Sequence, residues 1–252
     1  MAQVVPRRAG AGGPALVRML ARLAESEVPE DGPSLPDRLS LWLGWTDAVA
    51  LSAVLDRAAP AAVAEARADG DAHRRECARV RAVLAKAIVG GQPARGQAGP
   101  ASAAARVAAE TADFTLHRQR LLSYQRSMET AIGNLRARLR AALAAQRPDL
   151  LRLAAADAVM EQALGPRERR LLAAVPGVLE GRFERLRRAA GDALPPDDEP
   201  RAPAPAWLEV FRSEVRDVLL AELDLRFQPV EGLLAALNAR PAAREAAGAA
   251  SL

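Results

Sequence analysis

The chain has 252 residues, of which 50% are hydrophobic, 3% are aromatic and 26% are charged, and its formal net charge is +4. This length allows one or two domains with a sizeable core. The single cysteine, Cys77, excludes an internal disulfide framework and is typical of a reducing compartment. No stretch approaches the roughly 18 uncharged apolar residues of a membrane span, and the first residues do not resemble a secretory signal peptide. We therefore expect a cytoplasmic protein.

Strand signals are nearly absent from the sequence. It is rich in alanine, the best helix former, and has no hairpin turn between alternating apolar runs. These features predict an all-α fold. Lys86 is the only lysine among the 35 basic residues. A GC-rich genome explains that bias toward arginine, so arginine content alone does not indicate nucleic-acid binding.

The first part of the chain is predicted to form a disordered tail, residues 1–13, and a small helical unit, residues 14–89. Within the unit, 34–59 reads as a helix–turn–helix with Trp42 and Trp45 at its corner. Apolar residues at helical spacing predict four helices in the unit, at 15–27, 34–43, 46–59 and 71–89. The Gly-rich stretch 90–100 that follows is predicted to be a flexible linker.

The longest predicted helix covers residues 101–147, which contain no proline and a single glycine, Gly133. One row of residues recurs every seven positions and a second row runs beside it, as in a coiled coil. The first row is Val107, Phe114, Leu121, Met128, Leu135 and Ala142. The second row is apolar at Ile132 and Leu139 but polar earlier, at Thr111, Arg118 and Gln125. A helix this long needs a partner along its seam, and the half-polar segment 111–125 points to an oligomer or another protein.

Residues 149–190 are predicted to fold back along this helix, so that 101–190 forms a long antiparallel, coiled-coil-like hairpin. We expect helix breaks at Gly165-Pro166 and at Pro176-Gly177.

The C-terminal part is predicted to start with a proline-rich acidic linker, 191–205. Two helices should follow, at 206–226 and 230–238, separated by Pro229. Trp207 stands at the start of the first. Residues 239–252 are predicted to be disordered.

Charge is uneven along the chain. Residues 114–190 carry 15 arginines against seven carboxylates, a net charge of +8, whereas residues 191–252 carry 6 arginines against 11 carboxylates, a net charge of −5. Either the acidic part lies on the basic hairpin of its own or a neighbouring chain, or the hairpin faces an external polyanion.

Groups that could bind a metal are few. His73 and Cys77 would share a helix face, but a structural zinc needs about four ligands, and His117 is the only other histidine. We expect Cys77 to be a core residue and predict no metal and no cofactor.

No catalytic set can be assembled either. Nothing orients a cysteine–histidine pair, and the carboxylate pairs Asp157–Glu161 and Glu180–Glu184 are expected to balance arginines. The loop 90–100 lacks the lysine of a phosphate-binding loop. We therefore predict that the protein is not an enzyme.

Three stretches resemble a proteobacterial family of proteins of unknown function. They are LVRMLARLAESEVP at 16–29, LSLWLGWTDAVALSAVLD at 39–56 and ELDLRFQPVEGLLAAL at 222–237. The resemblance implies gene neighbours encoding OmpA/MotB-like and MotA/ExbB-like envelope proteins, and hence a cytoplasmic accessory to an envelope-spanning complex. It transfers no functional residues.

Our main hypothesis is a non-enzymatic helical interaction protein that binds a protein partner or its own copies. Large aromatic, seam and basic side chains are the candidate partner-binding residues. They are Trp42, Trp45, Phe114, Leu121, Met128, Arg136, Arg140 and Trp207. The alternative is nucleic-acid binding through the basic hairpin, centred on Arg136, Arg138 and Arg140.

Overall fold

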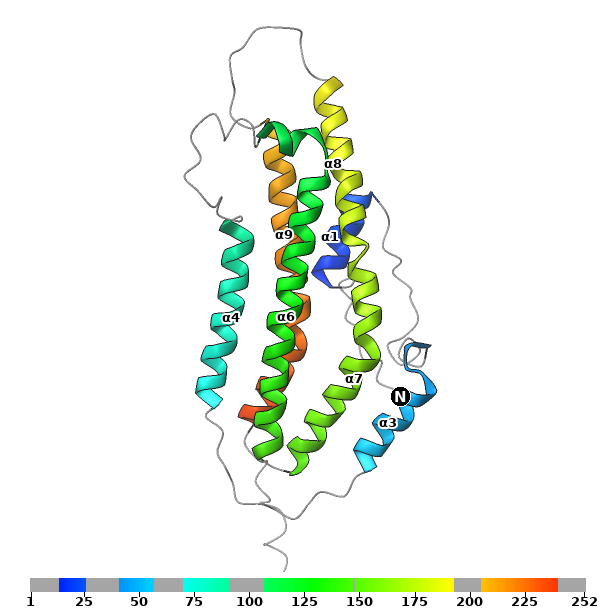
Figure 1. Ribbon diagram of the computed structural model, residues 1–252, viewed down its shortest axis with the longest axis vertical. Helices are drawn as coiled ribbons and strands as arrows, with labels where there is room; N and C mark the ends of the chain where they lie inside the picture. Colours follow the sequence, from blue (N-terminus) through cyan, green and yellow to red (C-terminus); the bar gives the residue numbers. More distant parts are fainter. Residues whose placement is uncertain are drawn as a thin grey trace, which may run out of the picture.

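The computed structural model describes residues 14–25, 41–56, 70–90, 107–146, 148–192 and 205–239. Every regular element in these ranges is a helix, which confirms the predicted all-α fold (Figure 1). The helices are α1 (Ala15–Ala24), α3 (Trp45–Asp56), α4 (Gly70–Gly90), α6 (Thr115–Gln146), α7 (Pro148–Leu172), α8 (Val175–Asp192) and α9 (Ala206–Asn238). None of these helices is long and apolar enough to cross a membrane.

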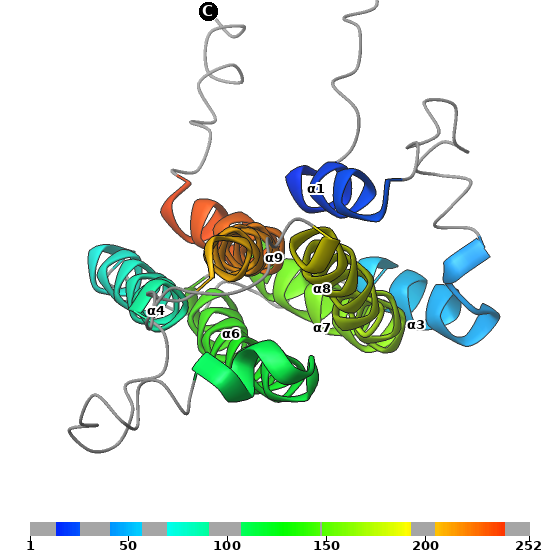
Figure 2. The same ribbon diagram turned by 90° about the horizontal axis from the view of Figure 1, so that it is seen from above.

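Helix α6 packs against α9, α7 and α4 (Figures 1 and 2). Its buried residues are spaced three or four apart, which brings them to one face of the helix. They are His117, Leu121, Gln125, Met128, Ile132, Leu135, Leu139 and Leu143. This face is the predicted seam, and the chain's own helices cover it.

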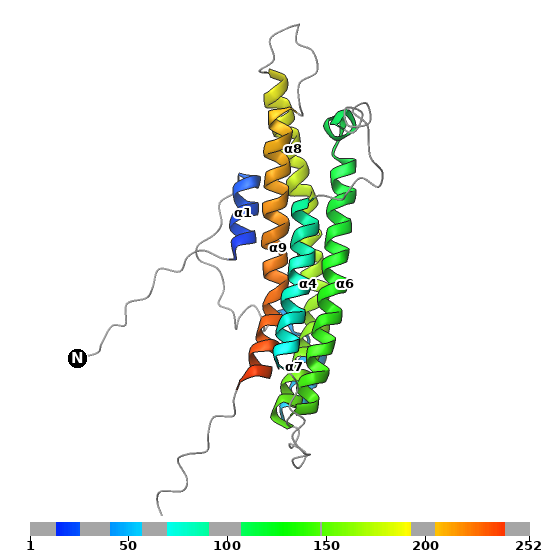
Figure 3. The ribbon, with the colours of Figure 1, turned by 90° about the vertical axis from the view of Figure 1, so that its left-hand side faces the viewer.

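Helices α6 and α7 form the predicted antiparallel hairpin, and α8 continues upward from the end of α7 (Figure 1). Helix α9 then runs beside α6 in the same direction, while α4 runs against both (Figures 1 and 3). The core therefore lies along α6 and α9, with α7 and α8 on one side of this pair and α4 on the other (Figure 2).

The predicted continuous helix 101–147 is interrupted. Residues 107–112 are helical, but the helix stops at Asp113 and Phe114 before α6 begins. An Oδ1 atom of Asp113 accepts a hydrogen bond from the backbone N–H of Thr115 at 2.7 Å, which starts α6 with a side-chain cap. Gly133, the single glycine of the predicted helix, lies inside unbroken α6.

Two predicted breaks at prolines are wrong. Helix α7 continues through Pro166, and α9 continues through Pro229. The second arm of the hairpin is instead interrupted at Ala173 and Ala174, between α7 and α8. Pro176 lies in the first turn of α8, where a missing N–H is tolerated. In α9, packing of the buried neighbours Phe227 and Val230 outweighs the backbone hydrogen bond lost at Pro229.

The N-terminal helices do not form a separate cluster as the predicted unit implied. Helix α1 packs against α8 and α9, α3 packs against α7, and α4 packs against α9 and α6. Helix α1 also ends earlier than predicted, at Glu25, whose φ of 54° is left-handed. The predicted tail 1–13 and most of the helix at 34–43, the linkers and the C-terminal end fall outside the described residues.

Candidate interaction site

The seam residues predicted to bind a partner form part of the core. Phe114, Leu121 and Met128 are 4%, 1% and 1% exposed. Helices α7, α8 and α9 close over this side of α6, so a partner cannot reach these side chains. The prediction that they contact a partner is therefore wrong for this conformation. The apolar face of α9 was the signal in the sequence for an internal partner.

An aromatic cluster occupies the end of the core where α6 begins. Phe114, His117, Phe183 and Phe211 lie with ring centroids 5.1 to 6.2 Å apart. Trp207 packs edge-on against Phe183 at 5.3 Å. Trp207 is thus half-buried at the edge of this cluster. Its packing on Phe183 accounts for a tryptophan at the start of α9 without a contact to another protein.

His117 and Glu110 are the buried polar groups at this end. The Nε2 atom of His117 lies 3.0 Å from the backbone oxygen of Glu110 and donates to it. Burial lowers the pKa of His117 from its ordinary value of 6.5. Burial alone would raise the pKa of Glu110, but hydrogen bonds from Arg212 and Arg120 outweigh it and the pKa is lowered. These pairs tie residues 107–112 to α6 and α9.

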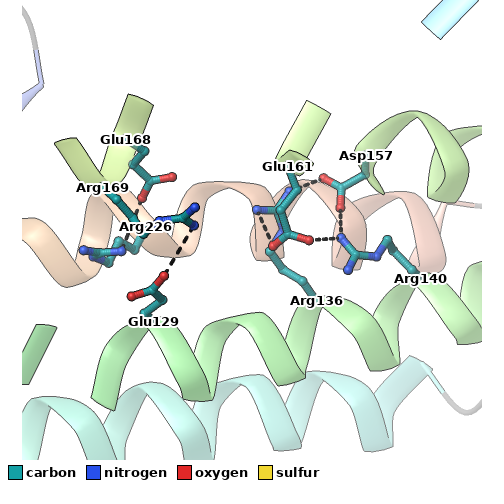
Figure 4. Close-up of polar contacts among 8 residues, drawn as sticks. All are labelled: Glu129, Arg136, Arg140, Asp157, Glu161, Glu168, Arg169 and Arg226. Carbon is teal, nitrogen blue, oxygen red and sulfur yellow. Dashed lines mark hydrogen bonds and ion pairs between the residues drawn. The ribbon is translucent and has the colours of Figure 1, made fainter. Parts of the chain in front are cut away.

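The basic centre of the hairpin is neutralised within the chain. Figure 4 shows Arg136 and Arg140 of α6 turned toward Asp157 and Glu161 of α7. Arg136 lies 2.7 Å from Asp157, and Arg140 lies 2.9 Å from the other oxygen of the same carboxylate. Both arginines also contact Glu161. The prediction that Asp157 and Glu161 balance arginines is confirmed, and this leaves the two arginines poorly placed to bind a polyanion.

Other basic residues of the hairpin pair in the same way. Arg138 lies 2.9 Å from Glu76 of α4. Arg182 of α8 donates to both carboxylate oxygens of Glu214 in α9, at 2.9 and 2.7 Å. The acidic C-terminal helix therefore contacts the basic hairpin of its own chain, as one of the two readings of the charge pattern predicted.

A second polar cluster crosses the core between α6, α7 and α9. Gln125 donates through Nε2 to the backbone oxygen of Leu172 at 3.2 Å and to Glu222 at 3.0 Å. Glu222 is fully buried and also accepts from Arg226 at 2.9 Å. Arg226 reaches Glu168 of α7 at 3.4 Å (Figure 4). Gln125, predicted as a polar gap in the seam, is satisfied inside the chain.

Of the candidate metal and thiol groups, Cys77 is a core residue, as predicted. Cys77 is buried, and burial raises the pKa of its thiol, which makes it a poor nucleophile. In the described part of the chain, no three His, Cys, Asp or Glu residues gather where they could hold a metal ion.

The outer side of α3 is different, because it is apolar and exposed. Trp45, Val49 and Leu55 are 84%, 50% and 55% exposed. The preceding Leu41 is 77% exposed. The helix packs on α7 and has no fully buried residue, and its Leu51 and Val54 are half-buried. We call Trp45, Val49 and Leu55 the α3 face.

The neighbouring tryptophan is placed differently. Trp42 is half-buried, and the guanidinium of Arg167 from α7 lies 4.6 Å from its ring centroid. An Asp47 oxygen accepts from the backbone N–H of Gly44 at 3.1 Å and caps α3. Trp42 thus anchors α3 to α7, while Trp45 points away from the bundle.

Together these features define an all-α protein whose buried charges are structural ion pairs and whose exposed apolar face lies on α3. The chain belongs to a family described as proteins of unknown function (DUF3348), whose model matches residues 1–239. No curated protein and no solved structure matches it. The match confirms that the chain belongs to a family of unknown function, as the resemblance in the sequence predicted. The association of that family with envelope proteins stays a prediction.

Proposed function

We propose that this chain is a non-enzymatic interaction protein that binds another polypeptide through the α3 face. The observation that carries the proposal is the position of Trp45. In the described part of the chain the other aromatic side chains are buried or half-buried, whereas Trp45 is 84% exposed. An exposed tryptophan flanked by apolar residues is typical of an interface centre.

Internal pairing of charges supports a structural rather than a catalytic role. The buried carboxylates Glu110 and Glu222 each contact arginines of the same chain. Such pairs position helices and leave no acid or base aimed at a substrate. Nucleic-acid binding has less support than protein binding, because Arg136, Arg138 and Arg140 already contact carboxylates.

The family resemblance adds a setting to this proposal. An accessory to an envelope-spanning complex must bind other polypeptides, and the α3 face would supply one such surface. The setting is tested by fractionation: the intact protein should sediment with membranes, and recovery of all the protein in the soluble fraction would contradict it.

The α3 face itself is tested by site-specific photo-crosslinking in cells that produce the protein. A photoreactive residue at Val49 should give crosslinked products that the Trp45→Asp substitution abolishes. The matched control is the same residue at Val210, which is 47% exposed on α9 at the other end of the bundle. Equal crosslinking from both positions, or none from Val49, would contradict the proposal.

A further inference from the structure

We infer that the polypeptide bound by the α3 face is a second copy of this chain, and that it presents the outer face of its α4. This inference rests on the proposed function of the α3 face and names its partner. The resulting contact is head to tail, with α3 of one copy on α4 of the next.

The outer face of α4 is exposed, apolar in part and basic. Cys77, Leu84 and Ile88 face the bundle. On the opposite side Arg79, Val83 and Lys86 follow one another at spacings of four and three residues, so they form one stripe. Val83 is 62% exposed, and Arg79 and Lys86 are exposed. We call these three residues the α4 face.

The α3 face has the complementary charge. Helix α3 has no basic residue, and its exposed carboxylate is Asp56, because Asp47 is half-buried and accepts a hydrogen bond from the backbone N–H of Gly44. Trp45, Val49 and Asp56 lie on one stripe, since they are four and seven residues apart. Asp56 is at the C-terminal end of the helix, where it accepts a hydrogen bond from the Ser52 hydroxyl of the same helix at 2.9 Å.

The two stripes match residue by residue when the helices run in the same direction. Trp45 precedes Val49 by four residues, as Arg79 precedes Val83. With the two valines in contact, the guanidinium lies beside the indole ring, a favourable cation–π arrangement. Lys86 then lies about one helical turn from the level of Asp56, within reach of a lysine side chain.

Like faces fit each other less well. Two α4 faces packed antiparallel about a twofold axis at Val83 would bring Arg79 of one copy beside Lys86 of the other, which is repulsive, and two α3 faces would bring no opposite charge to either Asp56. The unlike pairing removes this repulsion. It is the pairing that the exposed charges of the two helices favour.

The positions of the two faces decide the form of the assembly. Helices α3 and α4 lie at opposite edges of the bundle in both views (Figures 1 and 2). One molecule therefore cannot pair its own two faces. A contact between different faces of identical copies leaves one face of each kind open, so copies add in a chain or close into a ring.

The first experiment uses the fact that Lys86 is the only lysine. A carbodiimide joins carboxylates to amines in contact, so a mixture of isotopically light and heavy protein should give crosslinked peptides that join Lys86 of one copy to an α3 carboxylate of the other. Mixed light–heavy products identify a contact between copies. Lys86→Arg retains the charge but removes the amine, and it should abolish the product without abolishing assembly.

The second experiment measures mass by light scattering over a range of concentrations. The measured mass of the wild type should increase with concentration. Trp45→Asp and Val83→Glu should each raise the dissociation constant of the assembly about tenfold or more. An equimolar mixture of these two variants should stop at a dimer, because one retains a working α4 face and the other a working α3 face. Val210→Asp should assemble like the wild type, and circular dichroism should show that every variant is folded.

Three results would overturn the inference. They are a monomer at all concentrations, assembly insensitive to Val83→Glu, or a variant mixture that remains monomeric. If the protein is a monomer and Val49 still crosslinks to a different protein in a Trp45-dependent manner, the proposed function stands and only the identity of the partner is wrong. If the protein neither assembles nor gives Trp45-dependent crosslinks from Val49, the proposed function is wrong as well.

Discussion

Single polar residues inside the bundle hold its helix ends in place. The backbone oxygen of Leu172 would normally accept from the N–H four residues later, but that residue is Pro176, which has no N–H. Gln125 donates to this oxygen instead and joins it to Glu222. One amide thus satisfies the orphaned carbonyl at the end of α7 and a buried carboxylate of α9.

Replacing Gln125 by alanine should therefore destabilise the protein strongly. It leaves a buried carbonyl without a donor and removes one partner of a buried carboxylate, so we expect a loss of about 2–4 kcal/mol. Urea denaturation followed by circular dichroism measures it. Gln119→Ala, at an exposed position of the same helix, should change stability by less than about 0.5 kcal/mol. Equal effects would show that the Gln125 contacts contribute nothing.

His117 should make stability depend on pH. Its pKa in the folded protein lies below 6.5 because burial disfavours the charged ring. Below pH 6.5 the unfolded chain therefore binds more protons than the folded one, and stability should fall as pH drops from 7 toward 5. The lowered pKa of Glu110 acts in a separate window, with stability lost as pH falls below its ordinary value of 4.5.

His117→Phe tests the assignment, because it keeps an aromatic ring in the cluster and removes the titrating group. The variant should show a flatter stability curve between pH 7 and 5, measured by urea denaturation at each pH. Gln119→Ala, a change on the same helix that leaves His117 in place, should keep the slope of the wild type. A slope that persists in His117→Phe would assign the pH dependence to other groups.

At the scale of the elements, packing overrides local helix signals. Pro166 and Pro229 should end helices, and the sequence predicts that they do. In the structure the buried residues Phe227 and Val230 on both sides of Pro229 contribute to the core, so α9 remains one helix of 33 residues. The interruption that matters is at Asp113 and Phe114, where Phe114 turns into the aromatic cluster.

Pro166 should consequently be a local weakness of α7. It is exposed and leaves the backbone oxygen of Gln162 without its helical donor. Pro166→Ala restores that hydrogen bond and should raise the free energy of unfolding by about 1–3 kcal/mol, as measured by urea denaturation. Pro205→Ala, just before α9, should change it little. A destabilised Pro166→Ala variant would show that α7 needs the proline.

At the scale of the whole molecule, α9 connects most of the bundle. It packs against α6, α4, α8 and α1. These helices should unfold together, since none of them can leave without exposing the face of α9 it covers. Helix α3 is the exception, because it meets only α7 among the main packing pairs and buries no residue completely.

Tryptophan fluorescence can separate these two behaviours, because the chain has three tryptophans at known places. A variant that keeps only Trp207 should unfold in urea together with the far-ultraviolet circular dichroism signal. A variant that keeps only Trp42, beneath Arg167, should report release of α3 at a lower urea concentration. Identical midpoints for the two variants would show that α3 is part of the same cooperative unit.

Periodicity within the chain was enough to find the seam. The face of α6 at Leu121, Met128 and Leu135 is buried as its spacing predicts, and the pairing of Arg136 and Arg140 with carboxylates of α7 follows from the expected hairpin. What covers the seam could not be read from spacing, because α9 is separated from α6 by more than 50 residues. The seam residues proposed to bind a partner were for this reason assigned to the wrong surface.

The sequence by itself determined the helical class, the hairpin and the seam, because these depend on helix propensity and apolar spacing within short stretches. Only the tertiary structure decided that α9 covers the seam, that Gln125 finds its partners inside the chain, and that Trp42 and Trp45 point in different directions. These outcomes depend on contacts between distant segments, whose combined burial exceeds the local preferences of single residues.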